Sequence, residues 1–180
     1  MITGRAWVFG DNVNTDLMAP ARFLSGPVVQ YAPHCMESLQ PAFAKEVKPG
    51  DIVVGGMNFG CGSSREQAPE SLKYLGVAAV VAKRFARTFY RNSMNIGLPA
   101  IVCDEAAAIP QGARLSISIE EGVIRHLDTG ETYQCQAIPL HLMSMLNDGG
   151  LLGHLEKQLR AASVRPERNA MESKDERGLR

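Results

Sequence analysis

Three short apolar segments separated by two helical patterns limit the possible folds more than any other feature of the chain. The apolar segments are residues 52–54, 78–82 and 98–102. The middle one is apolar throughout, which is typical of a strand buried on both faces of a sheet. The helical patterns, residues 65–75 and 84–95, are followed by Gly76 and Gly97, and glycine suits the left-handed conformation that ends many helices. This alternation of strands and helices predicts an α/β fold with a parallel sheet.

The segments before this unit are less regular. Residues 5–9 predict a first strand, whereas residues 22–44 predict a long connection in which only residues 34–39 suggest a short helix. His34 and Cys35 are neighbours there, but consecutive side chains on a helix point about 100° apart. We therefore do not expect them to form a catalytic pair.

After residue 102 the pattern changes from buried to half-buried. Residues 114–120 and 132–138 alternate between apolar and polar side chains, as strands with one solvated face do. Residues 139–162 predict a helix interrupted at an Asp-Gly-Gly sequence. The remaining residues, 163–180, are charged and nearly devoid of large apolar side chains, so we expect a flexible tail after a single domain of residues 1–162.

Composition excludes several classes of protein. Lysine plus arginine equals aspartate plus glutamate at 19 each, so nothing indicates a nucleic-acid partner, and no apolar run is long enough to cross a membrane. No secretory signal is evident, and we expect a cytoplasmic protein. The four cysteines and four histidines are dispersed along the chain, without the close pairs that hold zinc or iron–sulfur clusters. We expect reduced thiols and no metal site within this chain.

The sequence most suggestive of chemistry is GGMNFGCGSSREQAP, residues 55–69, a glycine-rich turn between a strand and a helix. Such a turn aims backbone N–H groups and the positive end of a helix at an anion. Ser63 and Ser64 each begin an S-x-x-E/Q pattern, so they could simply cap the helix. If Ser64 were the cap, Pro69 would be the fifth helical residue, where proline removes a hydrogen bond. The helix is therefore expected to start nearer Glu66 or with a distorted first turn, which leaves both serine hydroxyls free.

Other signatures fail on spacing. The turn lacks the third glycine of a dinucleotide-binding loop, the lysine of a phosphate-binding loop and the G-x-S-x-G of a hydrolase. Cys61 has no nearby histidine in the sequence to activate it as a nucleophile. What remains is Arg65, whose planar guanidinium suits a carboxylate, beside a serine that clustered donors would make more acidic. The residues thus favour chemistry on a carboxylic acid without naming the reaction.

A second polar segment follows the first predicted strand. It offers four hydrogen-bonding side chains, Asn12, Asn14, Thr15 and Asp16. Such residues bond their own backbone in turns, so the segment is either an ordinary structured loop or part of a site.

The motifs resemble those of a known family. The strings NFGCGSSREQAP and VVAKRFARTFYRNSMNIGLP, with GDNVNTDLMAP near the start, closely resemble the small subunits of 3-isopropylmalate dehydratase and the swivelling domain of the aconitase superfamily. The resemblance covers roughly residues 3–155. It implies an α/β swivelling domain with β/β/α layers that docks, as a heterodimer or heterotetramer, onto a large subunit carrying a [4Fe–4S] cluster.

The resemblance also implies roles for single residues. Ser63 would be the base that removes a carbon-bound proton, Ser64 and Arg65 would bind substrate carboxylate, and Thr15 and Asp16 would belong to the substrate-binding loop. The implied activity is a hydro-lyase reaction that moves a hydroxyl group between adjacent carbons of a hydroxy di- or tricarboxylic acid in leucine biosynthesis.

One departure from the family pattern keeps alternatives open. Gln67 stands where many members have histidine, which leaves homocitrate or dimethylmalate as possible substrates. The segment of residues 22–30 resembles the family's substrate-sorting loop in position, but its sequence does not identify the side chain that it accepts. A module that binds carboxylates without catalysis is the alternative from another class.

Overall fold

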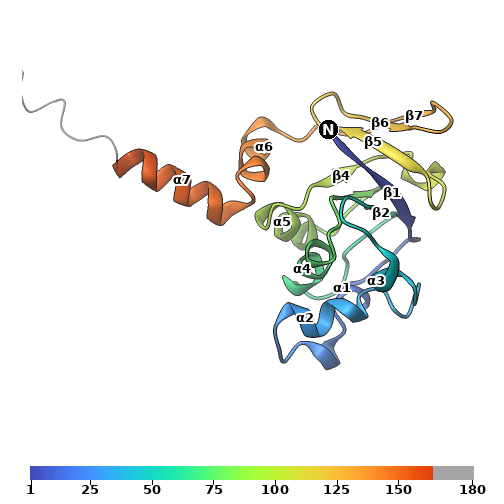
Figure 1. Cartoon of the computed structure of the whole chain (residues 1–180), viewed down its shortest axis with the longest axis horizontal. Helices are drawn as coiled ribbons and strands as arrows, with labels where there is room; N and C mark the ends of the chain where they lie inside the picture. Colours follow the sequence, from blue (N-terminus) through green and yellow to red (C-terminus); the bar gives the residue numbers. More distant parts are fainter. Residues whose placement is uncertain (164–180) are drawn as a thin grey trace, which may run out of the picture.

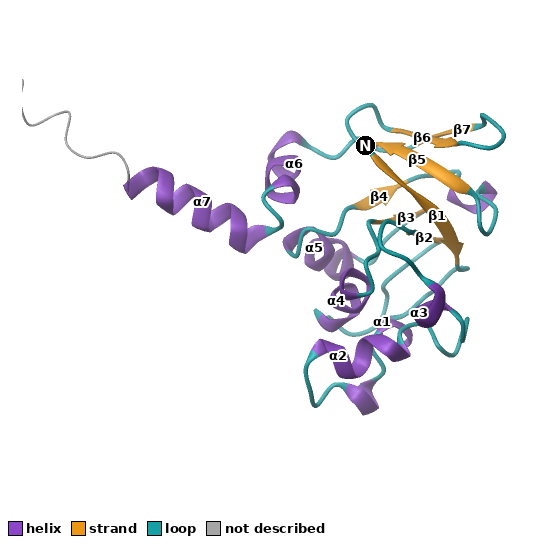
Figure 2. Cartoon of the chain, viewed as in Figure 1, coloured by secondary structure: helices purple, strands orange, loops and turns teal. Residues whose placement is uncertain are grey.

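The computed structural model describes residues 1–163, which form one curled seven-stranded sheet with most of the helices on one side (Figures 1 and 2). The strands are β1 (Ile2–Val8), β2 (Ile52–Gly55), β3 (Ala79–Ala82), β4 (Ala100–Val102), β5 (Arg114–Ser118), β6 (Val123–His126) and β7 (Thr132–Gln134). Their order across the sheet is β4-β3-β2-β1-β5-β6-β7.

The sheet has a parallel half and an antiparallel half. Strands β1 to β4 run parallel, with Val8 opposite Val54 and Val54 opposite Val81. Strands β5 to β7 continue from β1 as an antiparallel meander. The predicted parallel unit and its strand order along the chain are confirmed.

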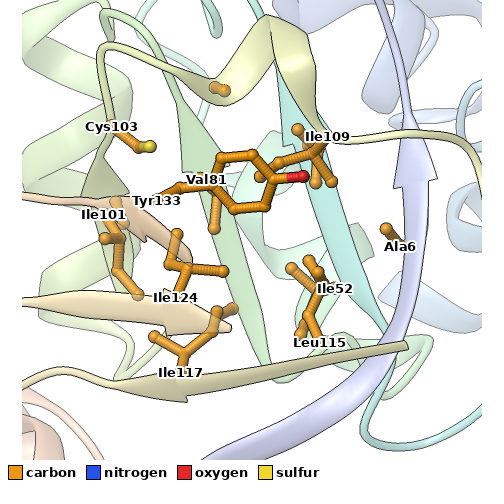
Figure 3. Packing of buried hydrophobic residues seen from close by; sticks show 14 of the residues in the cluster. Ala6, Ile52, Val81, Ile101, Cys103, Ile109, Leu115, Ile117, Ile124 and Tyr133 are labelled. Carbon is orange, nitrogen blue, oxygen red and sulfur yellow. The ribbon is translucent and has the colours of Figure 1, made fainter. Parts of the chain in front are cut away.

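Two apolar cores lie on opposite faces of the parallel half. Successive residues of a strand point to opposite faces, so Ile52 and Val54 pack in one core while Val53 packs in the other. The first core lies between the two halves of the curled sheet, where Val81 and Ile101 face residues of β5 to β7 such as Ile124 (Figure 3). The second core lies between the parallel half and the helices. The expected β/β/α layering is thus confirmed.

The helices after β2 and β3 cover the second core. The α-helices are α1 (Thr15–Met18), α2 (Val28–Tyr31), α3 (Phe43–Glu46), α4 (Gln67–Tyr74), α5 (Arg87–Asn95), α6 (Leu140–Asn147) and α7 (Leu151–Ser163). Short 3-10 turns span Ala21–Phe23, Ala32–His34 and Ala106–Ala108. Leu72 of α4 and Phe89 of α5 point into this core. The predicted interruption of the last helix is confirmed at Asp148, and α7 extends away from the sheet (Figure 1).

The curled sheet brings its two outer strands close together. The N–H of Gln136, just after β7, donates to the carbonyl of Val102 in β4 at 2.8 Å. The N–H of Gln134 in β7 donates to the side chain of Glu105 at 3.0 Å. The chain that follows each outer strand therefore contacts the other outer strand.

The prediction of a short helix at residues 34–39 is wrong. The chain forms a succession of turns there, because Met36 adopts a left-handed φ of 60° and its N–H donates to the carbonyl of Leu17 at 2.7 Å. That turn buries the Met36 side chain completely in the second core. Regular helix occurs instead at α2, and strand β6 was not predicted at all.

No helix within residues 1–163 is both long and apolar enough to cross a membrane. The expected flexible tail lies, except for Ser163, outside the described residues.

Candidate active site

Helix α4 starts after the two serines. Its N-cap is Glu66, which makes no side-chain capping bond, and its first helical residue is Gln67. Pro69 is consequently the third helical residue, where no helical hydrogen bond requires its N–H. Ser63 and Ser64 lie in the exposed turn ahead of the helix. The interpretation that Pro69 separates the serines from the helix is confirmed.

The turn is fastened to the loop that follows β1. The N–H of Gly60 donates to the carbonyl of Val13 at 2.7 Å, and the N–H of Thr15 donates to the carbonyl of Cys61 at 2.8 Å. Strands β1 and β2 are parallel neighbours, so their carboxyl ends meet at one edge of the sheet. The two polar segments singled out in the sequence therefore form a single structure.

Two glycines allow the turn to approach α5 and the loop after β1 closely. Gly60 has a φ of 77°, and a Cβ there would lie 2.1 Å from Cγ of Phe89. Gly62 has a φ of 99°, and a Cβ there would lie 3.2 Å from Oγ1 of Thr15. A side chain at either position would strain the backbone and press on a neighbour that holds the turn.

Thr15 contacts the predicted base directly. Its hydroxyl donates to the carbonyl of Ser63 at 3.1 Å and lies 3.3 Å from the Ser63 hydroxyl oxygen. A threonine hydroxyl has one proton. While that proton is bonded to the carbonyl, the Thr15 oxygen can only accept the proton of Ser63. Asn14, by contrast, has a local role, because its side chain accepts the N–H of Leu17 and caps α1.

Arg65 is held by Asp16, which lies next to Thr15 in the loop after β1. One guanidinium nitrogen, Nη1, donates to the carboxylate of Asp16 and, at 3.3 Å, to the carbonyl of Ala19. The side chain of Arg65 is 22% exposed and that of Asp16 is 54% exposed. Within residues 1–163, Nη2 and Nε of Arg65 have no hydrogen-bond partner, so most of the guanidinium fork is free to bind a carboxylate.

The turn also presents backbone donors. In the described part of the chain, the N–H groups of residues 63–66 donate to no acceptor. Ser63, Ser64 and Arg65 line an open cavity of about 390 Å³ together with Glu66 and Gln67. Unbonded N–H groups next to a guanidinium stabilise negative charge, whether on a substrate carboxylate or on a serine oxygen.

All five site residues predicted from the sequence lie together: Thr15, Asp16, Ser63, Ser64 and Arg65. The backbone carbonyl of Ala19 was missed, because a contact through a main-chain oxygen leaves no trace in the residue type. The contribution of Phe59 was missed as well. Its ring is fully buried against Phe85 and Phe89, which fixes the start of the turn.

The discarded pair of residues 34 and 35 lies away from the serine turn. His34 bonds Glu37 at 2.7 Å and stacks on Phe23, while Cys35 is fully buried, and burial raises the pKa of its thiol far above the ordinary value. The expectation that they do not form a catalytic pair agrees with this geometry. All four cysteines are unpaired, and among residues 1–163 no three histidine, cysteine or acidic side chains come together as metal ligands.

Comparison with known proteins gives the same class as the fold and the turn. Residues 30–106 match the model of the aconitase C-terminal domain. The chain is 47% identical over 161 residues to a 3-isopropylmalate dehydratase small subunit of Nautilia profundicola, covering 89% of this chain and 97% of that relative. It is 48% identical over 160 residues to a methanogen homoaconitase small subunit of Methanothermobacter thermautotrophicus, covering 88% and 93%.

A solved structure agrees in three dimensions. The crystal structure of a 3-isopropylmalate dehydratase from Methanocaldococcus jannaschii superposes with a TM-score of 0.86 at 40% identity, covering 91% of this chain and 98% of that one. The fold and the serine–arginine turn therefore define a swivelling domain of the aconitase superfamily. Within that class, the chain belongs to the family of hydro-lyase small subunits that includes those of 3-isopropylmalate dehydratase and homoaconitase.

Proposed function

We propose that the chain is the small subunit of a 3-isopropylmalate dehydratase, which interconverts 2-isopropylmalate and 3-isopropylmalate by removing and re-adding water. The observation that carries the proposal is the serine hydroxyl of Ser63, hydrogen-bonded to Thr15 and set between unbonded N–H groups and Arg65. The identity of 47% to a small subunit of that name supports the choice of reaction. The proposal places the enzyme in the cytoplasm, within leucine biosynthesis.

Ser63 acts as the base in this proposal. Its oxygen takes the proton from the carbon next to the one that bears the hydroxyl group, the carbon–carbon double bond forms, and the hydroxyl leaves. The serine oxygen carries a negative charge beforehand, and the N–H groups of the turn lower the free energy of that charge. While the serine oxygen is charged, the hydroxyl of Thr15 rotates and donates its proton to that oxygen instead of to the carbonyl of Ser63.

Arg65 and Ser64 orient the substrate. The free side of the Arg65 guanidinium binds one carboxylate in a bidentate manner, and the Ser64 hydroxyl donates to the same group. Asp16 holds Nη1 of Arg65 and thereby fixes the plane of the guanidinium. Asp16 and Thr15 thus serve the substrate by positioning the residues that touch it.

A large subunit completes the site. The proposal assigns to it a [4Fe–4S] cluster, which supplies a Lewis acid for the departing hydroxyl group when it is bound. The candidate residues of this chain occupy one open edge, so a second surface has to cover the substrate and exclude water.

The test uses this chain assembled anaerobically with its large subunit. Ser63→Ala should lower kcat about a thousand-fold, because removal of a general base costs roughly 10²- to 10⁴-fold. It should leave assembly and thermal unfolding unchanged. Ser116→Ala, which removes a half-buried serine from β5 in the antiparallel half of the sheet, is the matched control and should retain full activity. A Ser63→Ala enzyme with unchanged kcat would remove Ser63 from the mechanism.

A homoaconitase small subunit is the second candidate, because the chain is equally similar to a relative of that name at 48% identity. The assembled enzyme should be compared on isopropylmalate, homocitrate and dimethylmalate. The substrate with the highest kcat/KM identifies the enzyme, and inactivity on all three with retained binding of a dicarboxylate would indicate a carboxylate-binding module.

A further inference from the structure

A second cavity lies at the same edge of the sheet as the candidate site. Its volume is about 680 Å³, and its polar lining consists of Arg84, Arg87, Arg91, Thr88, Tyr90 and Gln136. No acidic side chain lines it. We call it the arginine cavity.

The segment that lines the arginine cavity is hydrogen-bonded to the start of the serine turn. The carbonyl of Arg84 accepts the N–H of Phe59 at 2.9 Å, and the carbonyl of Phe59 accepts the N–H of Ala86 at 2.9 Å. Phe59 begins the turn that carries Ser63. The arginine cavity and the serine turn thus adjoin along one edge, within reach of a single partner surface.

The cavity has unneutralised positive charge. Arg84 pairs with the exposed Asp104. Arg87 and Arg91 are exposed on α5, and neither forms an ion pair with any residue of the described range 1–163. The neighbouring acid Glu105 is engaged by the N–H of Gln134. Burial raises the pKa of Tyr90, so its phenol keeps its proton and can donate a hydrogen bond.

The spacing of the arginines suits a protein surface better than a small anion. Arg87 and Arg91 are four residues apart, so they lie on one face of α5 about one helical turn, roughly 5–6 Å, from each other. Each can take a separate carboxylate, and the cavity is larger than one carboxylate or phosphate requires. An acidic stretch of polypeptide presents carboxylates at such separations.

We propose that the arginine cavity is a docking site for an acidic segment of the large subunit, with Arg87 and Arg91 each paired to a carboxylate of that segment. This rests on the proposed function, since it assumes that a large subunit covers the serine turn. The charges steer association and orient the two subunits, whereas the chemistry stays with Ser63 and Arg65.

The test measures association of the full chain with the large subunit. The double variant Arg87→Glu/Arg91→Glu should raise Kd at least ten-fold, and the log–log slope of Kd against salt concentration should become shallower than in the wild type. Activity should be recovered at high concentrations of the variant subunit, because the loss lies in assembly. Arg87→Lys/Arg91→Lys keeps both charges and should stay within a few-fold of the wild-type Kd.

The matched control is Arg125→Glu, which reverses an exposed arginine of β6 in the antiparallel half and should not change Kd. Thermal unfolding of every variant checks that it folds. An unchanged Kd for the double glutamate variant would overturn the docking site while leaving the proposed function intact. A wild-type pair that neither associates nor turns over substrate would instead overturn the proposed function.

Two further outcomes would also overturn the docking site. Calorimetry on the isolated chain with malate and with inorganic phosphate measures whether a small anion binds. If either anion binds to the wild type but not to the double glutamate variant, the arginine cavity holds a small anion. If kcat at saturating subunit falls while Kd stays constant, the arginines contact the substrate.

Discussion

The two halves of the sheet bury their strands in different ways. Strands β2 and β3 of the parallel half bury every residue, whereas β5, β6 and β7 bury only alternate residues. Both halves contribute to the core between them, but only the parallel half also supports the second core beneath the helices. Every predicted site residue follows a strand of the parallel half.

This difference shows what each half contributes. Packing on both faces fixes the ends of β1 and β2, so the loops that leave them can hold hydroxyl and guanidinium groups in a defined geometry. The antiparallel half covers the first core and leaves its outer face to solvent. Equivalent substitutions in the two halves should therefore lower the free energy of unfolding by different amounts.

The largest difference in stability is expected between two glycines that share the same positive φ. Gly60, in the serine turn, and Gly130, in the turn between β6 and β7, both have a φ of 77°. Gly60→Ala should lower the free energy of unfolding by about 4 kcal/mol, since the left-handed conformation costs about 1–2 kcal/mol and overpacking against Phe89 about 1–3 kcal/mol more. Gly130→Ala should cost only about 1 kcal/mol, because nothing lies within 4 Å of its Cβ. Urea unfolding measures both changes in free energy. Equal losses for the two variants would contradict the expected difference between the halves.

A smaller difference is expected between two aspartates. Asp51 is buried immediately before β2. It accepts the indole N–H of Trp7 at 2.9 Å and the N–H groups of Lys48 at 3.0 Å and Arg5 at 3.2 Å. Asp51→Ala should cost about 3 kcal/mol of unfolding free energy, because it leaves the indole N–H buried without an acceptor. Asp128→Ala, on the exposed side of the antiparallel half, should lower the free energy of unfolding far less, because its ion pair with Arg114 is exposed to solvent. A large shift for Asp128→Ala would show that this half also depends on its polar contacts.

The smallest effect concerns acid sensitivity in the antiparallel half. The hydrogen bond from Arg114 lowers the pKa of Asp128 below its ordinary value, with a lesser contribution from His126. A lowered folded-state pKa stabilises the fold above the unfolded pKa, near 4, and that contribution is lost as pH falls through the folded pKa. In Arg114→Gln the pKa of Asp128 should rise toward its ordinary value in a side-chain NMR titration. Arg125→Gln is the control, and an unmoved Asp128 in Arg114→Gln would contradict the assignment.

Much of the parallel half could be predicted because its signals are local. The uninterrupted apolar run at residues 78–82 and the glycines after each helix are sufficient to predict strand, helix and strand. The chain at 34–39 and strand β6 could not be predicted in this way. Met36 adopts a left-handed conformation that methionine rarely takes, because its side chain then fills the second core. Strand β6, Val123–His126, is only four residues long and has polar side chains at half its positions.

The candidate site also has one part that the sequence predicts and one part that it does not. Pro69 alone separates the serines from the helix, so their position in a free turn follows from the sequence. The contacts of Thr15 with Ser63 and of Asp16 with Arg65 join residues 48 and 49 positions apart. They exist because β1 and β2 are neighbours in the sheet, and no local pattern encodes that adjacency.

The bonds between the two outer strands have a consequence for how the molecule behaves among its own copies. An unpaired strand edge is a template on which another chain can add a strand, the first step of aggregation. Here β4 and β7 are three residues each, Val102 already accepts from Gln136, and Gln134 already donates to Glu105. A small subunit made ahead of its partner thus offers little edge for such growth, and can wait for assembly without polymerising through its sheet.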